Sequence, residues 1–471
     1  MPAEIKGLNE ECGVFAVWGH EDAAQITYYG LHSLQHRGQE GAGIVASDGE
    51  NLHLEKGLGL ITEVFQEKNF DRLHGRAALG HVRYATQGDG GYDNVQPLLF
   101  RSQSGGLALA HNGNLVNAQA LKSQLEAQGS ILQTTSDTEV IAHLIKRSGN
   151  LPLNDRIKQA LSMLKGAYAL AIMTEDQLFV AQDPRGLRPL SIGQMGDGYV
   201  VSSETCAFDV VGAEYIRDVE PGEMLMINEE GIHADRFSAP IQRTTCSMEY
   251  VYFSRPDSNI DGINVHSSRK RMGKQLAQEA PIDADIVTGV PDSSISAAIG
   301  YAEESGIPYE LGLIKNRYVG RTFIQPSQEL REQGVKMKLS AVRGIVEGKR
   351  VVMVDDSIVR GTTSRRIVRM LKEAGALEVH VRIGAPPIKN PCYYGIDTST
   401  TSELIAGSKS VSEIEEMIEA DSLAYLSVDG LESAIGKKEE SIKHGHCQAC
   451  FTGSYPTEIF PNTLHPHDKE V

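Results

Sequence analysis

The segment Val351–Ser364 constrains the fold of this 471-residue chain more than any other. Four apolar residues are followed by Asp355 and Asp356, and the small-residue run Gly361-Thr362-Thr363-Ser364 comes next. The apolar residues predict a strand buried in a parallel sheet, and the small-residue run predicts the start of a helix. A helix N-terminus offers free N–H groups and a positive dipole to a phosphate. The segment therefore predicts an α/β domain with an anion site at a strand end; simple helix capping is the competing explanation.

The sequence from about Met248 onward alternates between strand and helix patterns. We expect strands at Asp285–Val290, Tyr309–Ile314, Arg350–Val354 and Glu378–Ile383, and helices at Ser294–Ser305 and Thr363–Ala374. This alternation is typical of a mostly parallel sheet, whose ligands bind at the carboxyl ends of its strands. The stretch from Lys315 to Val335 has no clean period, and loops of that length are usually functional or disordered.

The N-terminal half follows a different pattern, in which short strands outnumber the helices of a simple βαβ alternation. We expect strands at Gly13–Val17, Ala167–Met173 and Tyr199–Ser202, and helices at Ala118–Gln128 and Leu153–Leu164. Packed sheets with helices outside fit this pattern. Because the chain is too long for one core, we expect domains at 12–232 and 246–400, joined by the polar connector His233–Thr245, and a C-terminal segment at 401–471.

The charge balance limits the classes of partner. The chain has 45 Lys and Arg against 62 Asp and Glu, a formal net charge of −17. A nucleic acid or an anionic membrane would need a local basic patch, so we expect neither as a partner. No apolar run is long enough to span a bilayer, and residues 1–11 lack the apolar core of a secretory signal. We therefore expect a cytoplasmic protein.

Cys12 stands at the start of the first expected strand. A cysteine beside a strand is most often part of the core, but removal of residues 1–11 would give Cys12 a free α-amino group. The unperturbed pKa of such a group, about 7.7–8.0, suits a general base for the residue's own thiol. One residue would then supply both the nucleophile and the base.

Three further motifs in the N-terminal half carry polar groups that could bind a substrate or stabilise an oxyanion. Arg83, in His81-Val-Arg-Tyr-Ala-Thr86, can bind a carboxylate with two hydrogen bonds. In His111-Asn-Gly-Asn114, the side-chain amide of Asn112 next to the N–H of Gly113 would make an oxyanion hole. Asp137, in Ser136-Asp-Thr-Glu139, could bind an α-ammonium group, although the spacing of this motif is also that of a capping box.

These motifs, together with Cys12-Gly-Val-Phe and Gln35-His-Arg-Gly-Gln-Glu-Gly41, resemble the N-terminal-nucleophile glutaminase family. The resemblance implies an αββα sandwich in which Cys12 is the nucleophile. It also implies that Arg83 and Asp137 bind the carboxylate and amino group of glutamine, and that Asn112 and Gly113 form the oxyanion hole. Residues 1–11 then correspond to a propeptide.

The segment Val351–Ser364 resembles the ribose-phosphate motif of type I phosphoribosyltransferases. The resemblance assigns sugar-phosphate binding to Asp355, Asp356 and the residues of the following loop: Gly361, Thr362, Thr363 and Ser364. Thr288-Gly-Val-Pro-Asp-Ser293-Ser resembles the pyrophosphate turn of that family, which implies Mg²⁺ binding by Ser293 with Asp355 and Asp356. The loop containing Lys315 and Arg321 resembles its catalytic loop, whose cations would neutralise the departing pyrophosphate. A solvated basic loop and an ordinary helix cap are the competing explanations for these two segments.

Six cysteines are too few for a disulfide scaffold in a chain of this length. The spacing of Cys447-Gln-Ala-Cys450 fits zinc, redox or iron–sulfur chemistry almost equally. His444 and His446 lie nearby in the sequence and are of a residue type that binds zinc, so a zinc site remains an alternative. We expect Cys206 to be a buried small apolar residue. One branch of the glutamine phosphoribosylpyrophosphate amidotransferases carries a [4Fe–4S] cluster. By resemblance its ligands here are Cys246, Cys392, Cys447 and Cys450.

The resemblance to the glutamine phosphoribosylpyrophosphate amidotransferases covers nearly the whole chain. It implies that ammonia from glutamine displaces pyrophosphate from phosphoribosyl pyrophosphate to give phosphoribosylamine for purine synthesis. It also implies inhibition by purine nucleotides and a homo-oligomer, expected to be a tetramer. Two alternatives are a phosphoribosyltransferase-like regulator that binds DNA, which would need a basic module, and a glutaminase with another acceptor, which would need a domain other than that of Val351–Ser364.

Overall fold

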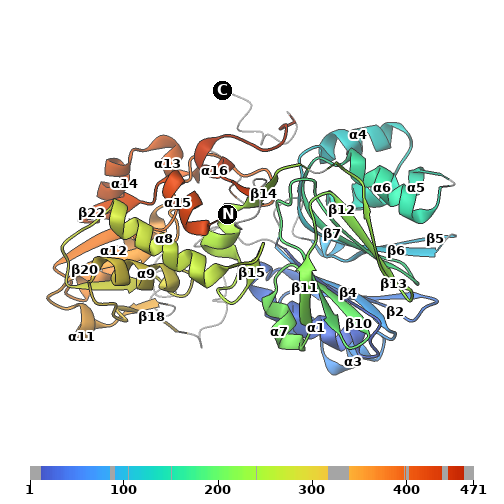
Figure 1. Ribbon diagram of the computed structural model, residues 1–471, viewed down its shortest axis with the longest axis horizontal. Coiled ribbons are helices and arrows are strands. Elements are labelled where there is room, and N and C mark those ends of the chain that lie inside the picture. Colours follow the sequence, from blue (N-terminus) through green and yellow to red (C-terminus); the bar gives the residue numbers. More distant parts are fainter. Residues whose placement is uncertain are drawn as a thin grey trace.

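The computed structural model describes residues 12–84, 91–103, 105–149, 151–239, 241–316, 339–396, 398, 403–436 and 444–460. They form two lobes, one from each half of the chain (Figure 1). The expected propeptide, residues 1–11, and the loop residue Arg321 lie outside the described residues.

The first lobe contains two antiparallel sheets. One has the order β11 (Glu214–Asp218), β9 (Ser191–Met195), β10 (Gly198–Ser202), β1 (Gly13–Trp18), β4 (Ala77–Arg83), β2 (Gly41–Ser47) and β3 (Leu52–Leu58). The other has the order β13 (Gly231–Arg236), β12 (Glu223–Asn228), β8 (Leu178–Gln182), β7 (Gly166–Met173), β6 (Gly105–Leu115) and β5 (Leu98–Ser102).

The two sheets pack face to face, with helices on their outer faces (Figure 1). Alternate residues such as Val14, Leu79 and Ala110 fill the apolar layer between the sheets. The outer face of the first sheet packs on α1 (Ala23–Ser33), α2 (Ile61–Val64), α3 (Glu67–Phe70) and α7 (Cys206–Val211). The second sheet packs on α4 (Ala118–Ala127), α5 (Thr138–Arg147) and α6 (Leu153–Met163). The expected αββα sandwich is therefore confirmed.

One expectation about this lobe is wrong. The polar stretch His233–Thr245 was expected to be a connector, but its first residues belong to β13, which pairs antiparallel with β12 along its whole length. An edge strand with both faces partly in water has no apolar alternation, so the sequence pattern there does not differ from that of a loop.

The second lobe is built on a four-stranded parallel sheet in the order β17 (Ile286–Gly289), β20 (Arg350–Asp355), β21 (Glu378–Ile383) and β22 (Ser422–Tyr425). One face packs on α8 (Val265–Glu279), α9 (Ile295–Ser305) and α15 (Val428–Ile435). The other packs on α12 (Thr362–Glu373), α13 (Ile405–Ser408) and α14 (Val411–Ile418). Since β22 belongs to this sheet, the sheet continues beyond residue 400, where the sequence suggested a boundary.

Short elements complete this lobe and its junction with the first. They are β18 (Leu313–Lys315), which pairs with β19 (Leu339–Ala341); α11 (Arg343–Val346); the π-helical turn η3 (Glu249–Phe253); the hairpin of β15 (Asn259–Ile260) and β16 (Ile263–Asn264); and α16 (Ala449–Thr452). Between the lobes, β14 (Arg243–Cys246) pairs in parallel with β23 (His444–Cys447) (Figure 1). This pairing joins the linker after the first lobe to the C-terminal segment.

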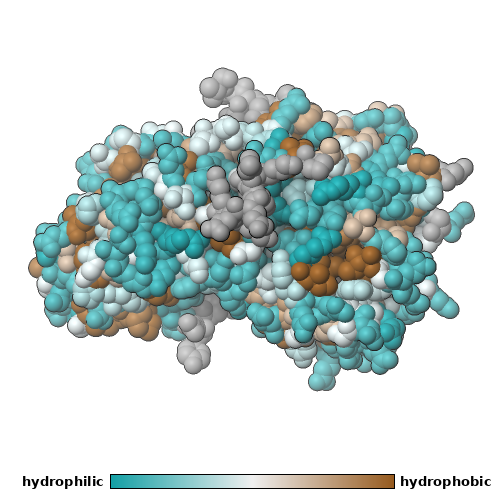
Figure 2. Space-filling model, viewed as in Figure 1, coloured by the Kyte–Doolittle hydropathy of each residue, from teal (hydrophilic) through white to brown (hydrophobic). Residues whose placement is uncertain are grey.

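On the face shown in Figure 2, hydrophilic residues cover most of both lobes, and apolar residues form small groups and one larger group on the lobe at the right. Within the part of the chain that the structure describes, no helix has the length and apolar character needed to cross a bilayer.

The contact between α8 and α9 leads to a stability prediction. A Cβ at Gly300 would lie 1.9 Å from the carbonyl oxygen of Lys270, so Gly300→Ala forces the two helices apart. We expect a loss of about 1–3 kcal/mol of stability, measured by thermal denaturation. Gly344→Ala in α11 is the matched control, because a Cβ there meets nothing within 4 Å. Equal midpoints for the two variants would contradict this account of the packing.

Candidate active sites

Strand alternation directs the first group of functional side chains into the space between the two sheets of the first lobe. Strands β1 and β4 pair with Gly13 opposite Val82 and Val14 opposite His81. Cys12 and Arg83 continue this register by one residue, so they lie next to each other on the inner face. The Cys12 thiol donates to the carbonyl oxygen of Tyr84 at 3.6 Å, and Arg83 is 4% exposed. The expected nucleophile and the expected carboxylate-binding arginine are thus together.

The opposite sheet supplies Asn112 and Gly113 from β6. Asn112 is fully buried, and neither atom of its side-chain amide has a hydrogen-bond partner among the described residues. A buried amide without a partner is costly unless a ligand binds it, and this is what an oxyanion hole requires. Gly113 has φ +133°, and a Cβ there would lie 2.2 Å from the carbonyl oxygen of Ala167. No other residue fits this position, because both the backbone angle and the space require glycine.

Asp137 lies at the N-terminus of α5, behind β6. Its Oδ2 accepts a hydrogen bond from the N–H of Leu115 at 3.0 Å, and its Oδ1 is 3.6 Å from His111 Nδ1. Burial raises the pKa of this carboxyl, but His111 and the Leu115 N–H outweigh burial and lower it overall. Asp137 therefore remains an anion.

The expected capping box of α5 is not formed as the sequence suggested. Among the described residues, the Asp137 side chain makes no cap hydrogen bond, and Glu139 accepts hydrogen bonds from the N–H groups of Gln133 and Thr134, at 2.8 and 2.7 Å. The acidic side chain thus fastens the preceding loop, while the first helical N–H, that of Thr138, donates to the Ser136 hydroxyl at 3.2 Å.

His81, to which the sequence pattern assigns no role, lies two residues before Arg83 on the same face of β4. Its Nε2–H donates to the carbonyl oxygen of His111 at 3.1 Å, and so connects the two sheets next to Asn112. Burial lowers the pKa of His81 to about 3, so the ring is neutral. Its position in the quoted His81–Thr86 motif is the signal that could have identified it.

The second group lies at the carboxyl ends of neighbouring strands in the second lobe. The parallel register sets Gly289 of β17 opposite Val354 of β20. The turn after β17 therefore meets the acidic pair, and the Ser293 hydroxyl donates to Asp356 while Ser294 donates to Asp355 at 3.0 Å. Burial raises the pKa of both carboxyls, and the neighbouring Asp356 raises that of Asp355 further. A cation would relieve this repulsion, and hard oxygen ligands of this kind suit Mg²⁺.

The helix α12 begins next to the acidic pair. Gly361 precedes it with φ +77° and, having no side chain, leaves the first N–H groups, those of Thr362, Thr363 and Ser364, without a side-chain cap from the residues that the structure describes. This arrangement fits a phosphate, as the sequence indicated. Lys315 lies at the end of β18, with its ammonium 2.9 Å from Asp292 in the turn after β17.

The four cysteines expected to bind a cluster line one cavity. They are Cys246, Cys392, Cys447 and Cys450, and the register of β14 with β23 sets Cys246 opposite Cys447. Burial raises the pKa of the Cys447 thiol to about 12. The other lining residues include Arg188, which sequence analysis missed and whose Nη2 donates to the carbonyl oxygen of Tyr394 at 2.7 Å.

The geometry of this cavity bears on the kind of metal centre it fits. Among the described residues, no three His, Cys, Asp or Glu side chains converge closely enough to hold a single metal ion. A tetrahedral zinc ion takes all four sulfurs at about 2.3 Å, whereas each iron of a [4Fe–4S] cluster takes one thiolate. Four cysteines around one cavity are the donor set of either centre. Cys206 is buried elsewhere, as expected, and burial raises the pKa of its thiol to about 12.

Comparison with known proteins agrees with this division into two sites. Residues 81–210 match the glutamine amidotransferase domain family, and residues 265–391 match the phosphoribosyl transferase domain family. The chain is 74% identical to the amidophosphoribosyltransferase of Bacillus subtilis (strain 168), over 100% of this chain and 99% of that protein. The chain belongs to the amidophosphoribosyltransferase family.

Other amidophosphoribosyltransferases show the same full-length similarity. That of Staphylococcus aureus (strain MRSA252) is 56% identical over 96% of this chain and 92% of its own. A solved structure described as the glutamine phosphoribosylpyrophosphate amidotransferase of B. subtilis complexed with ADP and GMP covers 97% of this chain and 100% of its own, at 73% identity and a TM-score of 0.92. The expected fold of each half is thereby confirmed, and the chain is an enzyme with both domains in one polypeptide.

The unpartnered amide of Asn112 gives a prediction about hydrolysis. We expect Asn112→Ala to lower kcat for glutamate release by about 100–1000-fold, because one oxyanion donor is lost. The thermal midpoint should not fall, because the amide has no partner in the described structure. Asn117→Ala is the matched contrast, since that amide donates to the carbonyl oxygen of Met163 and accepts from the Lys165 N–H. It should lose stability and keep kcat, and the reverse pattern would refute the assignment.

Proposed function

We propose that the chain hydrolyses glutamine at Cys12 and transfers the ammonia to 5-phosphoribosyl 1-pyrophosphate. The products are 5-phosphoribosylamine, glutamate and pyrophosphate, and the reaction is the first committed step of de novo purine synthesis. The observation that supports this proposal is that two different groups of side chains, one around Cys12 and Asn112 and one around Asp355 and Asp356, lie in the two lobes of one chain, which match two different domain families. A phosphoribosyltransferase-like regulator leaves the site around Cys12 unexplained, and a glutaminase with another acceptor leaves the second site unexplained. Neither fits the full-length similarity.

In the first site, the Cys12 thiol loses its proton to the α-amino group and attacks the amide carbon of glutamine. The carbonyl oxygen becomes an oxyanion and is stabilised by the Asn112 amide and the Gly113 N–H. Collapse of this intermediate expels ammonia, which takes up the proton, and leaves a γ-glutamyl thioester that water hydrolyses to glutamate. Arg83 holds the substrate carboxylate and Asp137 its ammonium group. This mechanism requires cleavage between Glu11 and Cys12, because an acylated nitrogen is not a base.

In the second site, ammonia attacks the anomeric carbon of the ribose as the bond to pyrophosphate breaks. Asp355 and Asp356 bind the ribose hydroxyls, and the N–H groups at the start of α12 bind the 5-phosphate. Mg²⁺, held by Ser293, Asp355 and Asp356, would neutralise charge on the leaving pyrophosphate when bound. Lys315 and Arg321 add positive charge to the same group.

The four-cysteine cavity is proposed to hold one [4Fe–4S] cluster, with Cys246, Cys392, Cys447 and Cys450 as ligands. Because these cysteines come from three segments, the cluster would fasten the C-terminal segment to the linker and has no part in the transfer reaction. We further propose purine nucleotides as inhibitors, which is supported by the ADP and GMP named for a similar solved structure. We also propose that the protein is a homotetramer and that it is located in the cytoplasm.

Coupling between the sites tests the proposed function directly. We expect glutamate and pyrophosphate to form in equal amounts when protein with Cys12 as its first residue, checked by intact mass, receives glutamine, phosphoribosyl pyrophosphate and Mg²⁺. Omission of Mg²⁺ should abolish pyrophosphate release. Glutamate formed without pyrophosphate in the complete mixture would retain the glutaminase and refute the acceptor.

The metal content of the purified protein tests whether the four-cysteine cavity holds a [4Fe–4S] cluster. Protein purified without oxygen should contain about four iron atoms and as many sulfides per chain. Cys450→Ser should lose this iron, because it removes one ligand from the cavity. Cys206→Ser should keep it, because Cys206 is also buried but does not line the cavity. Active wild-type protein with zinc in place of iron, or with no metal, would refute the cluster.

A further inference from the structure

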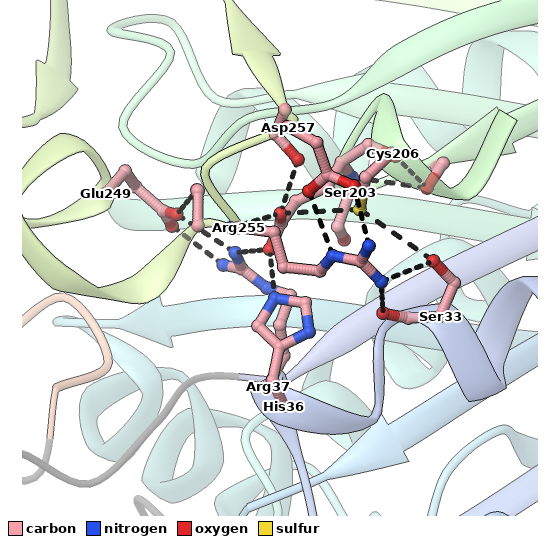
Figure 3. Close-up of polar contacts among 12 residues, drawn as sticks. Ser33, His36, Arg37, Ser203, Cys206, Glu249, Arg255 and Asp257 are labelled. Carbon is pink, nitrogen blue, oxygen red and sulfur yellow. Dashed lines mark hydrogen bonds and ion pairs between the residues drawn. The ribbon is translucent and has the colours of Figure 1, made fainter. Parts of the chain in front are cut away.

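A buried ion-pair network that contains Arg37 and Glu249 connects the two lobes (Figure 3). Arg37, the last residue of the 3₁₀ helix η1 (Gln35–Arg37), is 1% exposed. Its Nη1 and Nη2 donate to the two carboxylate oxygens of Glu249 at 2.9 and 2.7 Å. Its Nη1 also donates to Glu204 at 2.7 Å. Because Glu249 opens the η3 turn after β14, this contact crosses from the first domain to the segment that begins the second.

The third nitrogen of Arg37 reaches Cys12. Its Nε–H donates to the carbonyl oxygen of Cys12 at 3.2 Å. The pairing of β1 with β4 begins at Gly13, so Cys12 lies just outside the sheet ladder. The Arg37 side chain therefore holds the backbone of the proposed nucleophile at the point where the sheet pairing ends.

The orientation of Arg37 depends on Glu249. A guanidinium is a planar group whose direction is fixed when two of its nitrogens bind one carboxylate. The Glu249 carboxylate is itself held by the Ser254 hydroxyl, which donates to it at 2.6 Å, and by Arg188 at 3.6 Å. Movement of Glu249 would therefore turn Arg37 and displace the carbonyl of Cys12.

Stability alone does not account for these charges. Buried ion pairs lose so much hydration that apolar residues of similar volume often stabilise a protein equally well. An apolar side chain at position 37 would fill the space but could not donate to the Cys12 carbonyl. The network thus offers a geometric function that close packing does not.

We propose that Glu249 is a positioning residue for glutamine hydrolysis, which acts from the second-domain side through Arg37 on Cys12. This inference rests on the proposed role of Cys12 as the nucleophile. It means that the glutaminase site is completed by a residue beyond its own domain.

The decisive variant is Glu249→Gln, which keeps the shape of the side chain and removes its charge. We expect kcat for glutamate release to fall about 10–100-fold, because small displacements of a reacting group have effects of this size. KM for glutamine should stay within about twofold, because Arg83 and Asp137 bind the substrate separately. Pyrophosphate release with ammonium chloride in place of glutamine needs no nucleophile at Cys12, so it should remain at the wild-type level.

Two further variants separate positioning from general stability. Asp257→Asn removes a charge from the same segment, but Asp257 is half exposed and pairs with Arg255, so its kcat should match the wild type. Ser254→Ala removes only the hydrogen bond that orients Glu249. It should lower kcat for glutamate release several-fold, again without a change in KM or in the ammonium reaction.

Each outcome decides the question. Wild-type kcat in Glu249→Gln, or an equal loss in Asp257→Asn, overturns the inference. If Glu249→Gln loses the ammonium reaction as well, it has not folded, and Ser254→Ala decides: a selective loss of kcat supports positioning, and no loss overturns it. Failure of the wild-type protein to release pyrophosphate with ammonium would refute the proposed function and not this inference.

Discussion

Four charged side chains, each almost fully removed from water, lie together where the two lobes meet. They are Arg37, Arg188, Glu204 and Glu249. An unpaired buried charge costs several kcal/mol. Each of the four side chains therefore keeps the position of its partners within narrow limits. Arg37 binds the carbonyl of Cys12, and Arg188 binds that of Tyr394 beside the cysteine cavity. The same group of buried charges therefore holds the backbone both at Cys12 and beside the cysteine cavity.

The positions that could be predicted from the sequence depend on short-range rules. Cys12, Arg83 and Asn112 stand in short motifs whose chemistry and family resemblance indicate their roles. In the structure, Cys12 and Arg83 lie on the inner face of one sheet and Asn112 faces them from the other. The run from Val351 to Ser364 predicts a buried strand, its acidic end and a helix start without any knowledge of distant residues.

Other features depend on pairings between distant segments. Cys246 and Cys447 meet because β14 pairs with β23 about two hundred residues away. Their spacing gives no hint of this, and only the family resemblance groups them. The polar edge strand β13 and the use of Glu139 to fasten a loop both lack a distinctive pattern. Glu249 stands among Met248 and Tyr250 without any motif, so its contact with Arg37 emerges only from the fold.

The residues on both sides of the proposed glutamine site are anchored to the second half of the chain. The Cys12 side is held through Arg37 and Glu249, and on the Asn112 side the Asn114 amide donates to the carbonyl oxygen of Tyr393 at 2.9 Å. Ammonia is mostly protonated in neutral water, and the ammonium ion is not a nucleophile. A pocket whose catalytic edges are fixed against the acceptor lobe generates ammonia at the boundary with that lobe. With Cys12 as the proposed nucleophile, the contacts that hold its backbone also set where the ammonia would be released.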